Sequence, residues 1–336
     1  MTDDQFITMG DGSRSRAVDL PELFEAMTWT EDDGWCVRRA RKWANKTQDV
    51  VCVQTESGRI VRVSNEHPFW TADGWVAAAK LIPGVAVGVS RGMPCGASSV
   101  DLDRAFLLGA IIGDGGLTSK SRVLITIGAP EMVDAVAESV ARIGWRFIPR
   151  KGSKYTYSLS GYGRPGGPVG WIRGLGLEGT GSHTKLVPNE VSRWSAPCLA
   201  HFIAGYLEAD GTVTDGKSGR SVELYSVSRD LLDGFQSILL RLGVVSRLAR
   251  KRGRYKGDVH LSWRLAVCGS SIDQLASVLP GRCLKTIKLK TICNRVANDS
   301  FDLIPDGLID RFMATRYIRP GLGPRIDTRR PRGHQR

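Results

Sequence analysis

Leu107-Leu-Gly-Ala-Ile-Ile-Gly-Asp114-Gly115 and Ile203-Ala-Gly-Tyr-Leu-Glu-Ala-Asp210-Gly211 are two copies of one pattern in this chain. Each copy is an apolar, helix-like run with glycine in its third position, and each closes on Asp-Gly. The two aspartates stand about 96 residues apart, and similar helix and strand patterns follow each copy in the same order. The repeat predicts two α+β halves related by a pseudo-twofold axis.

Small residues recur along one face of each expected helix. Gly109 and Gly113 are four residues apart, as are Gly205 and Ala209. Residues at this spacing share a helix face, and glycine has no side chain to hold two backbones apart. We therefore expect the two helices to pack closely, with the two aspartates side by side at their C-terminal ends.

A pair of neighbouring carboxylates indicates a metal site. Asp114 and Asp210 would repel each other unless a cation lay between them. A divalent metal with open positions for water and phosphate is the expected partner. For either motif alone, Asp-Gly could simply end a helix and begin a turn, but its repetition in matched halves favours the metal.

The charge of the chain indicates a polyanionic partner. Among its 336 residues, 47 Lys and Arg face 34 Asp and Glu, which gives a formal net charge of +13. Such an excess is typical of nucleic-acid binding, although a basic soluble protein without such a partner is the alternative. The length predicts two or three domains.

The cysteines and the apolar runs indicate a cytoplasmic protein. The seven cysteines are scattered, none forms a Cys-x-x-Cys pair, and their odd number argues against a disulfide framework. The start of the chain lacks a charged-then-apolar signal segment. No apolar run approaches the roughly 18 residues of a membrane span, so we expect no contact with a membrane.

Several segments have clear secondary-structure patterns. Residues 1–93 are β-rich, and Asp101 could cap a helix that runs to Gly115. Residues 129–144, with proline in the first turn and glycine at the end, predict an amphipathic helix. Residues 230–243 predict its counterpart in the second half. The Arg-, Pro- and Gly-rich tail predicts disorder or an arm that orders on a polyanion.

The two motifs resemble those of LAGLIDADG homing endonucleases in their single-chain, two-motif form. His183-Thr-Lys185-Leu-Val-Pro188 followed by His201-Phe-Ile-Ala-Gly is similar to the block before the second motif in intein-borne members. Leu239-Leu-Arg-Leu-Gly-Val-Val-Ser-Arg-Leu is similar to the segment after it. The resemblance covers roughly residues 101–310. Glu208 stands at the position of the first Asp in the family name. That position commonly varies, and the difference is not expected to disturb catalysis.

The resemblance implies a fold, an activity and catalytic residues. The fold would be tandem αββαββα halves with a central helix pair and DNA-binding β-sheets. The activity would be Mg²⁺-dependent hydrolysis of both strands of double-stranded DNA by a monomeric, site-specific endonuclease. Asp114 and Asp210 would bind the metal, and Lys185 would assist catalysis near the scissile phosphate. The symmetry-related lysine would lie within residues 285–290, where Lys288 is chosen from its position before leucine.

Basic residues beside the expected strands are candidates for DNA contact. They would bind phosphates with strong salt dependence, while strand side chains would read bases in the major groove. The first-half candidates are Arg146, Arg150, Lys151 and Lys154, and the second-half candidates are Arg247, Arg250, Lys251, Arg252, Arg254 and Lys256.

The N-terminal region resembles the splicing (Hint) domain of inteins. Residues 2–14 are similar to its opening, and Val63-Ser64-Asn-Glu-His67-Pro-Phe-Trp is similar to its second conserved block. In inteins this histidine assists an amide-bond rearrangement, and Ser64 takes the usual threonine place. The nucleophile would stand one residue before Met1, and the closing His-Asn is missing. His67 and Ser64 are therefore interpreted as relics of splicing, and self-splicing by this chain is not expected.

These observations divide the chain into four parts and leave three functions open. We expect a partial Hint-like all-β domain over 1–95, a first LAGLIDADG half over 96–195, a second over 196–312 and a basic, disordered tail over 313–336. The leading function is a site-specific DNA endonuclease. The alternatives are a protein-splicing element whose terminal residues lie outside this chain, and a non-cutting nucleic-acid-binding LAGLIDADG protein.

Overall fold

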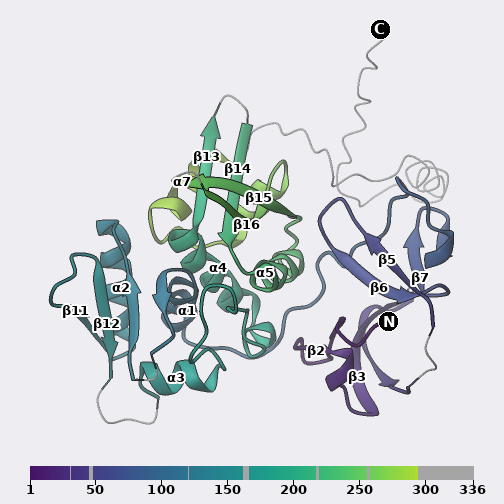
Figure 1. The fold of residues 1–336 in the computed structure, drawn as a ribbon, viewed down its shortest axis with the longest axis horizontal. Helices are drawn as coiled ribbons and strands as arrows, with labels where there is room; N and C mark the ends of the chain where they lie inside the picture. Colours follow the sequence, from purple (N-terminus) through teal and green to yellow (C-terminus); the bar gives the residue numbers. More distant parts are fainter. Residues whose placement is uncertain are drawn as a thin grey trace, which may run out of the picture.

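The computed structural model describes residues 1–30, 32–44, 48–119, 121–161, 166–216, 219–255 and 258–293. Figure 1 shows an N-terminal group of strands followed by two α/β halves that meet at a central pair of helices. The tail over 313–336 lies outside the described residues. No helix in the described ranges is both long enough and apolar enough to cross a membrane. All seven cysteines fall within these ranges, and each is a free thiol.

The N-terminal region consists of antiparallel strand pairs, as its alternating sequence predicts. Each pair forms its own two-stranded sheet, and two short 3₁₀ helices, Ala17–Asp19 and Ala78–Lys80, accompany them. The pairs are β1 (Phe6–Thr8) with β2 (Arg14–Arg16), β3 (Leu23–Thr30) with β4 (Gly34–Arg41), β5 (Val50–Gln54) with β6 (Ile60–Ser64), and β7 (Pro68–Thr71) with β8 (Gly74–Ala77).

The first half has the element order αββαββα. Its first helix begins where expected, because the Asp101 side chain accepts hydrogen bonds from the backbone N–H groups of Asp103 and Arg104 at 2.9 and 3.2 Å. It ends where Gly115 turns to extended backbone. The elements are α1 (Leu102–Asp114), β9 (Gly115–Gly116), β10 (Val123–Thr126), α2 (Pro130–Arg142), β11 (Arg146–Pro149), β12 (Thr156–Ser160) and α3 (Pro168–Gly174).

The second half repeats this order and adds a final helix. The sheet orders correspond as well: β9-β10-β12-β11 in the first half matches β13-β14-β16-β15 in the second. A 3₁₀ helix, Val191–Arg193, precedes the second half in the chain. The elements are α4 (Ala196–Asp210), β13 (Gly211–Gly216), β14 (Gly219–Ser226), α5 (Arg229–Arg241), β15 (Arg247–Tyr255), β16 (Asp258–Val267), α6 (Ser271–Val278) and α7 (Leu284–Ile292). The duplicated order expected from the sequence is confirmed.

Helices α1 and α4 pack backbone to backbone at the centre of the molecule. A Cβ on Gly109 would lie 2.0 Å from the Phe202 carbonyl oxygen, and a Cβ on Gly205 would lie 1.9 Å from the Phe106 carbonyl oxygen. These reciprocal approaches leave no room for any side chain at either glycine. The prediction of close packing through bare helix faces is confirmed, and the buried core extends outward from this pair.

The N-terminal strands are docked on the second half through buried polar contacts. The Arg241 guanidinium donates to the carbonyl oxygens of Gly12 and Ser192 at 2.6 and 2.7 Å. The turn between β5 and β6 meets the start of edge strand β15, where the Leu248 N–H donates to the Ser57 carbonyl oxygen at 2.9 Å. Gly58 follows at φ +84°, and a Cβ there would lie 2.0 Å from the Leu248 carbonyl oxygen.

Candidate functional site

The two motif aspartates end the two central helices. Asp114 is the last residue of α1, and Asp210 is the last residue of α4. Both side chains are half-buried. A Cβ on Gly113 would lie 2.5 Å from the Ala209 Cβ and 3.6 Å from Asp210 Oδ2. The close packing of the helices therefore brings the two carboxylates together, as the sequence predicted.

Two lysines flank the carboxylates in corresponding positions. The Lys185 ammonium donates to the carbonyl oxygens of Gly113 and Gly115 at 3.0 and 3.1 Å, at the end of α1. The Lys285 ammonium donates to the carbonyl oxygens of Glu208 and Ala209 at 2.6 and 3.2 Å, at the end of α4. Each cation thus lies at the negative end of a helix dipole.

The structure corrects one sequence choice. The sequence favours Lys288 as the symmetry-related lysine, but its side chain is exposed on α7. Lys285, three residues earlier, is the one whose ammonium reaches the end of α4. The sequence does not distinguish the two residues, because they lie on the same helix and it does not show that the N-terminal end of α7 is the end that meets α4. Which lysine assists catalysis stays a prediction.

The four charged groups perturb one another. Burial, and then the charge of Asp210, raise the pKa of Asp114 to about 6, against the opposing effect of Lys285 and Lys185. Burial also raises the pKa of Asp210, and the two lysines partly offset that shift. Burial lowers the pKa of both lysines, while the acids work in the opposite direction. The site therefore holds two acids whose joint ionisation is unfavourable, which is the property of a cation site.

The donor set fits magnesium better than a transition metal. Within the described ranges, no cluster of three or more His, Cys, Asp or Glu side chains is arranged to hold a metal ion. Asp114 and Asp210 would therefore offer a metal hard carboxylate oxygens, without a histidine or cysteine side chain from the described residues beside them. Mg²⁺ commonly binds through one or two carboxylates and completes its shell with water and phosphate oxygens, whereas Zn²⁺ favours three or four protein ligands.

The second-half sheet presents an exposed polar face. Residues paired directly across antiparallel strands share a face. Around Ala249 and Ala266, the register places together the polar residues Thr212, Glu223, Tyr225, Arg247, Lys251, Ser262 and Arg264. The Lys251 ammonium lies 4.1 Å from the centre of the Tyr225 ring, and Arg264 pairs with Glu223 at 3.1 Å. We call this set the polar face of the second half.

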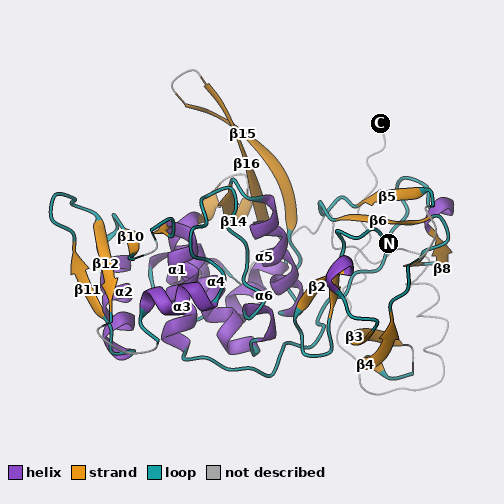
Figure 2. Ribbon diagram, turned by 60° about the horizontal axis from the view of Figure 1, so that its bottom comes forward, coloured by secondary structure: helices purple, strands orange, loops and turns teal. Residues whose placement is uncertain are grey.

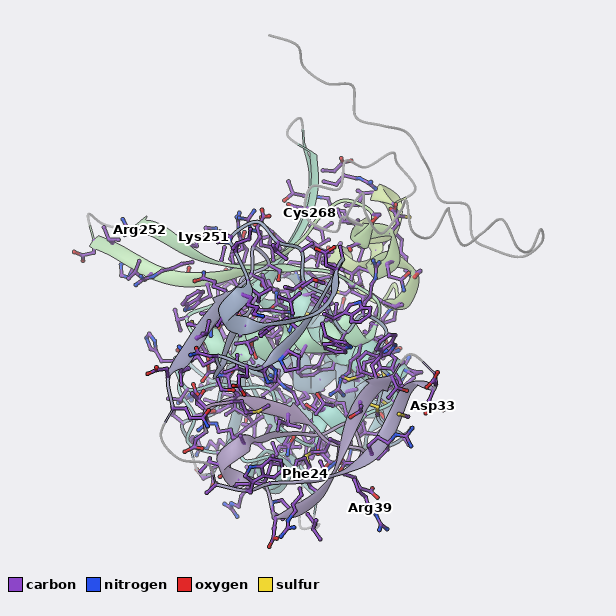
Figure 3. The ribbon with its side chains drawn as sticks, turned by 90° about the vertical axis from the view of Figure 1, so that its right-hand side faces the viewer. Phe24, Asp33, Arg39, Lys251, Arg252 and Cys268 are labelled. Carbon is purple, nitrogen blue, oxygen red and sulfur yellow. The ribbon has the colours of Figure 1, made fainter. Side chains whose placement is uncertain are left out.

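The hairpin of β15 and β16 extends this sheet away from the helices, as Figure 2 shows. Figure 3 labels Lys251 and Arg252 on it. Successive residues point to opposite faces, so Arg250 and Arg252 lie on the face opposite to Lys251. They pair with Trp263 and Leu261. The basic candidates of the second half are therefore divided between two faces.

The remaining DNA-contact candidates lie on β11, in the connection that follows it, or outside the described residues. Arg146 lies on β11 and pairs with Ser160. Arg150, Lys151 and Lys154 are exposed in the connection between β11 and β12. Lys256 and the side chain of Arg254 lie outside what the structure describes. The first-half sheet is shorter than the second, and its outer face also carries apolar residues such as Ile148, which is 42% exposed.

The residues that resemble a splicing site lie apart from the aspartates. Ser64 ends β6, and its carbonyl oxygen accepts a hydrogen bond from the His67 N–H at 3.1 Å. The His67 ring packs edge-on against Phe69. Burial, with a smaller effect from the charge of the N-terminal amine, lowers the pKa of His67. Ser64 also lines a polar pocket of about 460 Å³ together with Gln48, Asp49, Asn65 and Glu66.

Sequence reasoning missed three residues that the structure places at the site. In the sequence, Lys285 is one of three closely spaced lysines over residues 285–290. Arg264 lies on the polar face because its strand pairs with β14, which the local sequence does not specify. Glu208 looks like a neutral variation in the sequence, although its carboxylate accepts hydrogen bonds from α7. The sequence gives no direct signal for this role, because the burial of Glu208 is a property of the fold.

Comparison with known proteins supports part of this assignment. Residues 197–274 match the family described as "LAGLIDADG-like domain". The chain is 26% identical over 278 residues to a replicative DNA helicase DnaB of Synechocystis sp., which covers 76% of this chain and 31% of that protein. It is 28% identical over 283 residues to the DnaB of Rhodothermus marinus, covering 78% of this chain and 30% of that protein. The chain thus spans less than a third of these relatives.

A solved structure of a mesophilic variant of the homing endonuclease I-DmoI is also similar to this chain. The identity is 19%, the TM-score is 0.37, and the match covers 53% of this chain and 95% of that one. The family match over residues 197–274 confirms the expected LAGLIDADG relationship for the segment that contains the second motif. The resemblance of the N-terminal region to a splicing domain stays a prediction.

Proposed function

We propose that this chain is a site-specific DNA endonuclease that hydrolyses one phosphodiester bond in each strand. The observation that carries the proposal is the joint placement of Asp114 and Asp210 at the ends of two helices in backbone contact. A LAGLIDADG-like match over 197–274 supports it. The net charge of +13 fits a polyanionic substrate.

The chain's own residues have distinct parts in this reaction. Asp114 and Asp210 would hold Mg²⁺, which when bound supplies an activated water and neutralises charge on the scissile phosphates. Lys185 and Lys285 are held by backbone carbonyls beside the two acids, so their positive charge is already placed where negative charge develops. One lysine for each motif provides one cation for each DNA strand.

The polar face of the second half would lie on the DNA. Arg247, Lys251 and Arg264 supply positive charge there, and Thr212 and Ser262 supply hydroxyl groups. A basic sheet face favours phosphate contact and a steep loss of affinity with salt. A two-stranded ribbon such as β15 and β16 has dimensions that the major groove admits. The DNA would then cross both sheets, with the aspartate pair beneath its centre.

A cleavage assay tests the proposal. The purified chain would be incubated with a linear duplex spanning an uninterrupted candidate insertion site in a DnaB helicase gene, with Mg²⁺ or with EDTA. We expect two fragments with Mg²⁺ and intact duplex with EDTA. Intact duplex under both conditions, with binding at low salt retained, would favour a non-cutting nucleic-acid-binding protein instead.

A second candidate function is protein splicing together with residues outside this chain. The observation that favours it is the Ser64–His67 turn beside a polar pocket of about 460 Å³. Supplying flanking segments with a junction nucleophile and a closing His-Asn would test it. Ligated flanks that disappear in His67→Ala would support splicing, and unligated flanks would reject it.

A further inference from the structure

Glu208 is a buried carboxylate just before the metal-site aspartate of α4. Its side chain is in the core of the second half, and the residue is 7% exposed. Its Oε2 accepts a hydrogen bond from the Lys285 N–H at 3.0 Å, and its Oε1 accepts one from the Thr286 N–H at 2.7 Å. Both donors are in the first turn of α7, where N–H groups lack backbone acceptors within the helix, and the Thr286 N–H also faces the side chain of the N-cap residue Cys283. Glu208 therefore caps α7 from a different helix.

Contacts with this part of α4 hold both the backbone and the side-chain ammonium of Lys285. The backbone N–H of Lys285 is held by the Glu208 side chain, while its ammonium is held by the Glu208 and Ala209 carbonyl oxygens at 2.6 and 3.2 Å. The carboxylate is also favourably placed at the positive end of the α7 dipole. Loss of the cap would leave the Lys285 N–H without its acceptor and the Thr286 N–H with only the Cys283 side chain, and it would remove the carboxylate that joins the start of α7 to α4.

The first half holds its lysine by other means. The position equivalent to Glu208 in the first motif is Ile112, which is buried and apolar. Lys185 stands in a turn, where its N–H donates to the Gly181 carbonyl oxygen at 3.0 Å. Its own carbonyl oxygen accepts a hydrogen bond from Ser228 Oγ at 2.7 Å. The two lysines therefore occupy matching places through unrelated supports.

We propose that Glu208 is the positioning residue of Lys285, and that it controls cleavage of only one DNA strand. This inference rests on the proposed endonuclease function. Glu208 is too far into the core to act on DNA itself, so it acts through the lysine. Removing it displaces the cation at one motif and leaves Lys185 in place at the other.

The test compares strand-specific cleavage by Glu208→Ile and Glu208→Gln. Isoleucine copies the first motif, and glutamine keeps one acceptor oxygen. The probe is the candidate-site duplex with a different dye on each strand, and Lys285→Met and Lys185→Met are the references. We expect Glu208→Ile to slow cleavage of one strand by roughly 10- to 100-fold, as for a misplaced catalytic group. Cleavage of the other strand should slow by less than about twofold. The cleavage rate of the affected strand in Glu208→Gln should lie between that of Glu208→Ile and that of the unaltered chain.

The identity of the slowed strand separates positioning from general damage. The strand slowed by Glu208→Ile should be the one slowed by Lys285→Met, with nicked DNA accumulating. Equal slowing of both strands, or slowing of the strand that depends on Lys185, would overturn the proposal.

Hydrogen–deuterium exchange keeps the test independent of activity. If the unaltered chain cuts neither strand, the endonuclease proposal fails, and exchange then decides the role of Glu208. We expect the first-turn amides of α7 to exchange at least about tenfold faster in Glu208→Ile, because a broken cap lets the helix end open. The amides of α6 serve as the internal control and should be unchanged. Equal protection of α7 in the variant and the unaltered chain would overturn the proposal.

Discussion

Replacing Asp114 with asparagine should stabilise the metal-free protein at neutral pH. The pKa of this carboxyl is raised from 3.8 to about 6 by burial and by the charge of Asp210. A raised acid pKa means that the folded state resists ionisation more than the unfolded state does. Above about pH 6 the ionised carboxyl lowers the free energy of unfolding by the full amount of this shift. As the pH falls below 6 toward 4, protonation of Asp114 removes that destabilisation.

The magnitude follows from the size of the shift. At about 1.4 kcal/mol for each pKa unit, a shift of about two units corresponds to about 3 kcal/mol. The Asp114 side chain is only half-buried, and solvent screening removes about half of this. We therefore expect Asp114→Asn to gain about 1.5 kcal/mol at pH 8, or about 3–6 °C in melting temperature for a domain of this size.

Thermal melting in EDTA at pH 4.5 and pH 8 measures the effect. Asp134→Asn is the matched control, because it removes the same charge from an exposed position on α2 of the same half. The gain for Asp114→Asn should be present at pH 8 and largely lost at pH 4.5, and the control should show neither. Mg²⁺ at pH 8 should raise the melting temperature of the unaltered chain more than that of Asp114→Asn. A variant that melts lower at pH 8, or melts like the control, would refute the proposed repulsion.

Three further predictions concern the lysines, the helix contact and the N-terminal docking. Lys185→Met should slow single-turnover cleavage by about 100-fold at unchanged DNA affinity, while Lys288→Met should leave the rate unchanged. Equal cleavage rates for the two variants would show that Lys185 has no catalytic role. Gly109→Val should lower the free energy of unfolding by about 3 kcal/mol in chemical denaturation, because its side chain meets helix backbone; a neutral result would contradict the close approach. Gly58→Ala should destabilise by about 2 kcal/mol more than Gly74→Ala, since both have positive φ but only Gly58 abuts β15; equal losses would show that the docking contributes nothing.

The sequence predicted the parts of the fold that local patterns encode. Asp101 before an apolar run marked the start of α1, and Pro130 marked the start of α2. The repeated glycines predicted the helix contact because close approach leaves few alternatives to glycine. The aspartate pair followed from these helices and their duplication.

Other features depend on pairing between distant segments. Lys285 and Lys288 are three residues apart on one helix, so only the contact of the α7 start with α4 distinguishes them. Arg250 and Lys251 are adjacent, yet strand alternation sends them to opposite faces, and their register is set by β16. The docking of Arg241 on Gly12 joins residues more than 200 positions apart, and no local pattern indicates it.

Cleavage and binding by Asp114→Asn and Asp210→Asn test the central claim most directly. Each variant would be compared with the unaltered chain on the candidate-site duplex with Mg²⁺, and binding would be measured separately by gel shift in Ca²⁺. Asparagine keeps the shape of the side chain and removes its charge. We predict that neither variant makes a double-strand break and that both still bind the duplex. Full cleavage by both variants would contradict the claim that the two aspartates form the catalytic metal site.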